Sequence, residues 1–194
     1  MVKRVAIIIL NWNGEKLLRE FLPSVVKNTN ADLGRVVVVD NHSTDGSWRC
    51  LEQEFPDVER VLFEDNFGFA GGYNRAIEMI EAEYVVLLNS DVEVAPGWLE
   101  PLVAVLDRDE RVAAVQPKIL AYRDKNKFEY AGTDYGMDLY GRANIDQVRY
   151  KDGTVLTLDL TMGGIAGGGE KQDKENGVLI IRNSFPQLVD VDNL

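Results

Sequence analysis

The chain has 194 residues, of which 45% are hydrophobic and 27% are charged. This length and composition predict one soluble globular domain with a buried core, plus an appended segment. Acidic residues outnumber basic ones by 32 to 21, and the net charge of −11 argues against a nucleic-acid-binding protein. Cys50 is the only cysteine and His42 the only histidine, which excludes an intramolecular disulfide and any metal site built from several cysteines or histidines.

No stretch approaches the about 20 consecutive apolar residues that span a bilayer. The apolar run at residues 5–10 is too short for the core of a signal peptide. We therefore expect a cytoplasmic protein without a transmembrane segment, for which peripheral contact with the inner face of the membrane stays open.

Short apolar runs rich in β-branched residues alternate with segments of helical spacing. The runs predict five strands, at residues 5–10, 36–39, 58–63, 84–88 and 112–115. The apolar stripes between them predict four helices, which carry Leu17, Trp48, Ala76 and Trp98. Pro23 predicts a kink or a restart in the first helix. The alternation predicts a doubly wound α/β fold with a mostly parallel sheet.

The pattern weakens after about residue 118. Residues 119–162 predict irregular loops with a hairpin near residues 155–158. Residues 163–194 begin with a glycine-rich stretch, which is typical of a flexible linker, and end in an atypical tail.

Four predicted strands are followed by polar, acidic and glycine residues, at 11–14, 40–46, 65–74 and 89–91. Ligands of open α/β sheets bind outside the carboxyl ends of the strands, so these segments predict the binding site. Each segment also fits turns and helix caps, an alternative that stays open for residues 43–45.

Two residues of these segments carry a specific interpretation. Asp40 directly follows four valines, and we expect its carboxylate to accept hydrogen bonds from a base or a ribose. Trp12 lies between two asparagines and fits either a platform for a planar base or the core. We interpret His42 as a loop residue.

Gly68, Gly71 and Gly72 precede the third predicted helix, where the backbone can approach a phosphate. Neither GxGxxG nor GxxxxGK[ST] occurs. Asn74 and Arg75 then fall in the first turn of that helix, where Arg75 fits the crevice or a solvated surface.

Asp91 follows the fourth strand. One carboxylate can hold a hard divalent cation when substrate phosphates supply other ligands, so we predict that Asp91 binds metal. We interpret Glu93 as a partly exposed loop acid.

Taken in order, these segments resemble the family 2 glycosyltransferases, which have the GT-A fold. The resemblance rests on VAIIILNWNG, VVVVDNHSTDGS, EDNFGFAGGYNRAIEMIEAEYVVLLNSDVEVAPGWLE and VAAVQPKI, and it covers residues 3–118 and, more loosely, residues to about 142. It implies transfer of a sugar from a nucleotide-diphosphate donor to a saccharide or lipid-linked saccharide in polysaccharide biosynthesis. Transfer in the family is usually inverting and uses Mn²⁺ or Mg²⁺.

The resemblance also implies the functions of particular residues and segments. Residues 1–118 are then the nucleotide-sugar-binding half, and residues 119–162 begin the acceptor half. The implied base pocket is Asn11, Trp12 and Asn13, and the implied contacts to base or ribose are Asp40 and Asn41. Gly71, Gly72 and Asn74 then lie beside the nucleotide, while Asn89, Ser90 and the metal ligand Asp91 replace the DxD motif.

Two departures from the family pattern matter. Asn89 stands where the first DxD acid is expected, a variant of rhamnosyltransferase-like members, and it leaves Asp91 as the sole clear metal ligand. The later half is short, so the chain resembles a family member that is truncated or altered at its C-terminus. The catalytic base is therefore unassigned, because Asp190 and Asp192 are candidates by position only.

Two other functions stay open. One is a donor-binding or scaffolding protein without turnover. The other is a sugar-phosphate nucleotidyltransferase, which is disfavoured because no basic glycine-rich loop follows the first strand.

Overall fold

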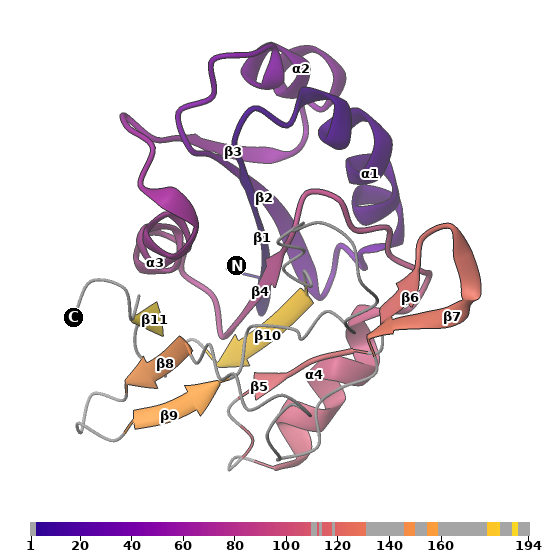
Figure 1. Cartoon of the computed structure of the whole chain (residues 1–194). Helices are drawn as coiled ribbons and strands as arrows, with labels where there is room; N and C mark the ends of the chain where they lie inside the picture. Colours follow the sequence, from indigo (N-terminus) through magenta and orange to yellow (C-terminus); the bar gives the residue numbers. More distant parts are fainter. Residues whose placement is uncertain are drawn as a thin grey trace, which may run out of the picture. The chain divides into compact units, whose positions relative to one another are not determined.

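The computed structural model describes residues 3–109, 112, 114–117, 119–130, 146–149, 155–158, 178–182 and 188–189 (Figure 1). The chain divides into two compact units. The first comprises residues 1–116 and 177–185, and the second comprises residues 117–176 and 186–194.

A mixed sheet forms the centre of the first unit. Its strands are β1 (Val5–Asn11), β2 (Gly34–Asp40), β3 (Glu59–Leu62), β4 (Tyr84–Leu88), β5 (Ala114–Val115) and β10 (Val178–Arg182). Their spatial order is β3-β2-β1-β4-β10-β5. The pairs within β3-β2-β1-β4 are parallel, whereas β10 runs antiparallel to both neighbours. The predicted mostly parallel α/β fold is confirmed.

Among the described residues, four helices flank this sheet: α1 (Glu15–Asn28), α2 (Ser47–Glu54), α3 (Gly68–Met79) and α4 (Leu99–Arg108). Side chains of α1, α2 and α4 share one core cluster with Val5, Ile7 and Ile9 of β1. Figure 1 shows α3 on the other side of the sheet from α1. The predicted restart at Pro23 is wrong, since α1 is one helix held by residues buried on both sides of the proline, among them Leu22 and Val25.

The start of α3 also corrects a prediction. The helix begins at Gly68, so its glycines lie within it rather than before it, and Asn74 and Arg75 fall in the second turn. Gly68 has φ +69°, a conformation that costs glycine little. At Gly72 the constraint is space, because a Cβ there would lie 2.8 Å from Leu10 Cδ2. The absence of a side chain therefore lets α3 approach β1 closely.

The second unit contains antiparallel pairs. β6 (Ile119–Ala121) pairs with β7 (Asp124–Tyr130), and β8 (Asp146–Arg149) lies between β9 (Val155–Leu158) and β11 (Leu188–Val189). The strand at 155–158 was predicted as part of a hairpin, but β6, β7, β8 and β11 were not predicted. The glycine-rich stretch at 163–177 lies outside the described residues.

The most informative difference concerns β10. This strand lies in the segment predicted as a tail, yet it pairs with β4 inside the main sheet. Ile180 is fully buried there. The apolar run at 178–181 is the sequence signal that predicts such a strand.

Candidate functional site

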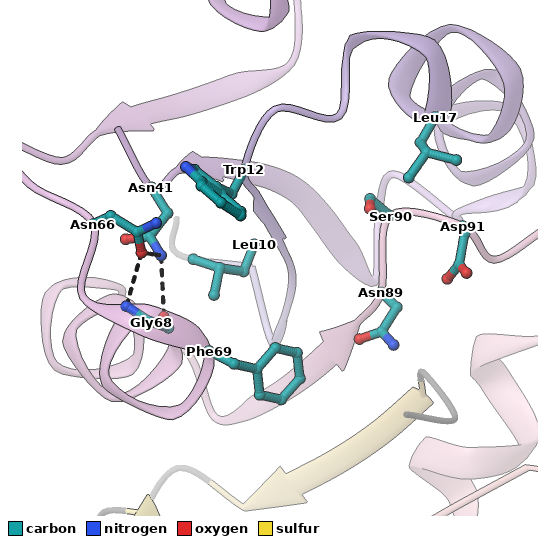
Figure 2. A pocket seen from close by; sticks show the side chains of 10 residues that line it. All are labelled: Leu10, Trp12, Leu17, Asn41, Asn66, Gly68, Phe69, Asn89, Ser90 and Asp91. Carbon is teal, nitrogen blue, oxygen red and sulfur yellow. Dashed lines mark hydrogen bonds between the residues drawn. The ribbon is translucent and has the colours of Figure 1, made fainter. Parts of the chain in front are cut away.

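A cavity of about 460 Å³ opens at the carboxyl ends of β1, β2 and β4 (Figure 2). It is lined by Leu10, Trp12, Leu17, Asn41, Asn66, Gly68, Phe69, Asn89, Ser90 and Asp91. The volume falls in the range of small-molecule and cofactor sites, and the location is the one expected for an open α/β sheet.

The cavity has two polar ends and an apolar middle. Figure 2 shows Asn41, Asn66 and Gly68 at one end, and Asn89, Ser90 and Asp91 at the other. The apolar side chains Leu10, Trp12 and Phe69 lie between them. Trp12 is 59% exposed and Phe69 48% exposed, so both offer aromatic surface that a ligand can cover. This exposure separates the two interpretations of Trp12, because a core tryptophan would be buried.

Asn41 organises the first polar end. Its Nδ2 donates to Asn66 Oδ1 at 2.8 Å and to the Gly68 carbonyl at 3.0 Å, and its Oδ1 accepts from the Phe67 N–H at 3.0 Å. The two backbone partners determine which amide atom is nitrogen and which is oxygen. Both amide hydrogens are therefore used, and Oδ1 keeps capacity for one further donor. The same bonds hold the start of α3.

The second polar end follows β4 directly. Asp91 is exposed and contributes a single carboxylate, while Asn89 and Ser90 contribute an amide and a hydroxyl to the same cavity. Within the described part of the chain, no cluster of three or more Asp, Glu, His or Cys could hold a metal ion, and no lysine or arginine lines the cavity. These oxygen donors fit Mn²⁺ or Mg²⁺ only when a ligand supplies further oxygens.

Three predicted ligand contacts, Asn11, Asn13 and Asp40, are not among the residues that line the cavity. Asn11 and Asp40 are 0% and 1% exposed. Asn11 Nδ2 donates to Asp40 Oδ2 at 2.9 Å, and the Ser43 N–H donates to Asp40 Oδ1 at 2.8 Å. Asn13 Oδ1 accepts from the Thr44 N–H at 2.7 Å. These residues tie the segments after β1 and β2 together, and Ser43 and Thr44 join the same network.

Asp45 has the turn role that the sequence left open. Its carboxylate accepts from the N–H of Glu15 at 3.1 Å and of Ser47 at 2.9 Å. Burial alone would raise the pKa of Asp45. The hydrogen bonds from Ser47 and Glu15 outweigh that effect and hold the pKa below its ordinary value.

Three further predicted residues lie on α3: Gly71, Gly72 and Asn74. None of them is among the residues that line the cavity. Gly72 acts through packing, as its closeness to Leu10 shows. Arg75 lies over the Phe67 ring, with the guanidinium carbon 3.7 Å from the centroid, and it is exposed. His42 is an exposed loop residue with φ 64°.

Four lining residues were not predicted as site residues: Leu10, Leu17, Asn66 and Phe69. Asn66 and Phe69 belong to the polar and glycine-rich stretch at 65–74, which was a usable signal. Leu10 and Leu17 match the apolar pattern of core positions. Sequence alone does not distinguish a leucine that packs in the core from one that lines a cavity.

The model of glycosyl transferase family 2 matches residues 6–165. The chain belongs to glycosyl transferase family 2. An uncharacterized glycosyltransferase of Nostoc sp. is 29% identical over 115 residues, which cover 58% of this chain and 35% of the relative. The N-acetylglucosaminyl-diphospho-decaprenol L-rhamnosyltransferase of Mycobacterium tuberculosis is 25% identical over 130 residues, with 61% and 42% coverage.

Solved structures agree with this family membership. A mannosyltransferase from Pyrobaculum calidifontis, solved in complex with GDP-Man and Mn²⁺, is 29% identical with a TM-score of 0.53; the match covers 65% of this chain and 38% of that one. TarS from S. aureus (residues 1–349) is 20% identical with a TM-score of 0.58. The match covers 93% of this chain and 47% of the TarS chain, and it supports the GT-A fold.

The chain thus spans 35% and 42% of the length of these two curated relatives. Among the described helices of this family member, none combines the length and apolar character needed to cross a bilayer.

Proposed function

We propose that this chain binds a nucleotide-diphosphate sugar in the cavity at the strand ends and transfers the sugar to an acceptor hydroxyl. The observation that carries the proposal is that an exposed aromatic side chain, Trp12, and a carboxylate, Asp91, line one cavity of suitable size. The base lies near Trp12 and Asn41, and the diphosphate lies near Asn89, Ser90 and Asp91.

The polar ends suit the two parts of the donor. Asn41 lines the cavity although it is 2% exposed, and its Oδ1 accepts one donor, the Phe67 N–H, which leaves capacity for an N–H of a base that reaches it. The diphosphate end has a carboxylate and no lining lysine or arginine among the described residues, and a divalent cation bound there would offset the phosphate charge. When bound, Mn²⁺ or Mg²⁺ stabilises the leaving diphosphate. The Mn²⁺ complex of the mannosyltransferase, a similar protein, supports this part of the proposal.

The other predicted site residues shape the loops and the helix around the cavity. Asn11, Asn13 and Asp40 hold the loops that present Trp12 and Asn41. Gly72 brings α3 close to β1, while Gly71 and Asn74 lie on the same helix, outside the residues that line the cavity.

The reaction we propose is a direct displacement with inversion. The acceptor hydroxyl attacks the anomeric carbon, a base takes its proton, and the diphosphate leaves. Asp190 and Asp192 lie outside the described residues, so the base stays unassigned. The name of the mycobacterial relative supports an acceptor of the lipid-linked saccharide class.

The test has two stages. Thermal-shift and calorimetric titrations with UDP, GDP, TDP and their sugar conjugates, with and without Mn²⁺, should find at least one nucleotide that binds more tightly with the cation. Mass spectrometry with saccharide acceptors then detects transfer. Binding without transfer to any acceptor would favour a donor-binding protein, and no binding of any nucleotide would contradict the proposal.

A further inference from the structure

A buried tyrosine contacts the point at which β4 enters the cavity. Tyr73, on α3, is 1% exposed, and its hydroxyl donates to the Leu88 carbonyl at 3.0 Å. Leu88 is the last residue of β4, and Asn89 follows it in the cavity wall. Because the peptide unit is planar, a bond to the Leu88 oxygen also orients the Asn89 nitrogen and Cα.

The same tyrosine also contacts the apolar middle of the cavity. Its ring packs edge-on against Phe69, with centroids 5.0 Å apart and an interplanar angle of 75°. The two residues are four positions apart on α3 and therefore share a helix face. Phe69 lines the cavity. Tyr73 thus joins the α3 wall to the strand end that carries Asp91.

The far end of the segment after β4 is also held. Asn28 Nδ2 donates to the Val94 carbonyl at 2.8 Å, and the Val94 N–H donates to Ser24 Oγ at 3.2 Å. Both partners belong to α1. Residues 89–93 therefore lie between two anchors, and Asp91 is exposed between them. Asp91 is only three residues after Leu88, so a shift of the Leu88 carbonyl also shifts Asp91.

We propose that Tyr73 is a positioning residue for Asp91. Its hydroxyl determines the direction in which the chain leaves β4. That direction in turn determines the position of the Asp91 carboxylate, which binds a cation shared with the donor diphosphate. Such shared sites tolerate small displacements poorly. The inference rests on the proposed function, since it concerns the metal-assisted part of nucleotide binding.

Tyr84 supplies a matched control. It is also 1% exposed, it begins β4, and its hydroxyl donates to Asp107 Oδ1 at 2.7 Å. It thus lies at the end of the strand remote from Asn89. Tyr73→Phe and Tyr84→Phe each remove one hydroxyl from a buried ring. The two changes differ in which end of β4 loses its anchor.

The readout is Mn²⁺ enhancement, the ratio of the Kd without Mn²⁺ to the Kd with Mn²⁺, measured calorimetrically for UDP, GDP and TDP. We expect the ratio to fall about three- to tenfold in Tyr73→Phe, the factor that one hydrogen bond represents. It should stay unchanged in Tyr84→Phe. An unchanged ratio in Tyr73→Phe, or an equal fall in both variants, would overturn the inference.

Amide hydrogen exchange tests the inference without any ligand. Exchange across residues 88–92 should be faster in Tyr73→Phe than in the parent chain and unaffected in Tyr84→Phe. Equal exchange in all three proteins would contradict a positioning role. A parent chain that shows no Mn²⁺ enhancement with any nucleotide would contradict the proposed function instead, and the exchange measurement would still test Tyr73.

Discussion

The ends of β2 and β4 each carry an aspartate, Asp40 and Asp91, in a similar polar context. Asp40 is 1% exposed, and its two oxygens accept hydrogen bonds from Asn11 and Ser43. Asp91 is exposed and lines the cavity. One carboxylate thus serves the scaffold and the other faces the ligand space, although both follow runs of buried apolar residues.

The difference arises from the neighbours of each carboxylate. Asp40 still belongs to β2 and lies directly beside Asn11 in the ladder, which places an amide donor within reach. The loop after β2 then folds back and adds the Ser43 N–H. Asp91 lies three residues beyond β4, in a turn at the cavity. The adjacent strand therefore supplies a partner for Asp40, whereas Asp91 lies beyond the ladder and faces the cavity.

The largest expected effect is a difference in the free energy of unfolding between variants of the two aspartates. Asp40→Ala leaves Asn11 Nδ2 and the Ser43 N–H without their buried acceptor, so the free energy of unfolding should fall by about 2–4 kcal/mol. Asp91→Ala should change it by less than about 0.5 kcal/mol, because the side chain is exposed. Urea denaturation measures both, and equal losses would break the comparison.

A smaller effect is expected at the apolar middle of the cavity. Trp12→Ala should weaken nucleotide binding by about 1–3 kcal/mol, the range for aromatic stacking on a base, and leave stability nearly unchanged. Leu62 on β3 is 54% exposed and does not line the cavity, so Leu62→Ala is the control for loss of exposed apolar surface. Calorimetric affinities that fall equally in both variants would exclude a stacking role.

The smallest expected effect is on the stability of the folded chain at acidic pH. Asp45 has a folded-state pKa below its ordinary value of 3.8, so its hydrogen bonds to Glu15 and Ser47 stabilise the loop after β2 fully above that value. This contribution is lost as the pH falls through the lower folded pKa, and exposure keeps it small. Asp45→Asn should show a shallower loss of stability below about pH 4 than the parent chain. Identical acid profiles in denaturant titrations would contradict the assignment.

The sequence predicted the order of strands and helices in the first unit because that information is local. Apolar runs and helical stripes mark β1, α1, β2, α2, β3, α3, β4 and α4 directly. The insertion of β10 was not predictable in the same way, since Val178 pairs with Leu88 across a long separation in the chain. An apolar run identifies a strand but does not specify its partner.

The site shows the same division between local and non-local information. The residues that follow the strands and line the cavity are Trp12, Asn41, Asn89, Ser90 and Asp91. The burial of Asp40 depends on its cross-strand neighbour Asn11, which sequence spacing does not reveal. The inclusion of Phe69 depends on how closely α3 approaches β1, and that distance depends on Gly72.

The central claim is that the Asp91 end of the cavity binds a cation together with a nucleoside diphosphate. Asp91→Asn keeps the shape of the side chain and removes its charge, while Glu93→Gln removes the same charge two residues away, outside the residues that line the cavity. The decisive measurement is the calorimetric Kd of UDP, GDP and TDP, with and without Mn²⁺, in the parent chain and both variants. We expect the Mn²⁺ enhancement to disappear in Asp91→Asn, to persist in Glu93→Gln, and the bare nucleoside to bind equally in all three. An undiminished enhancement in Asp91→Asn would show that the cation binds elsewhere and would contradict the account.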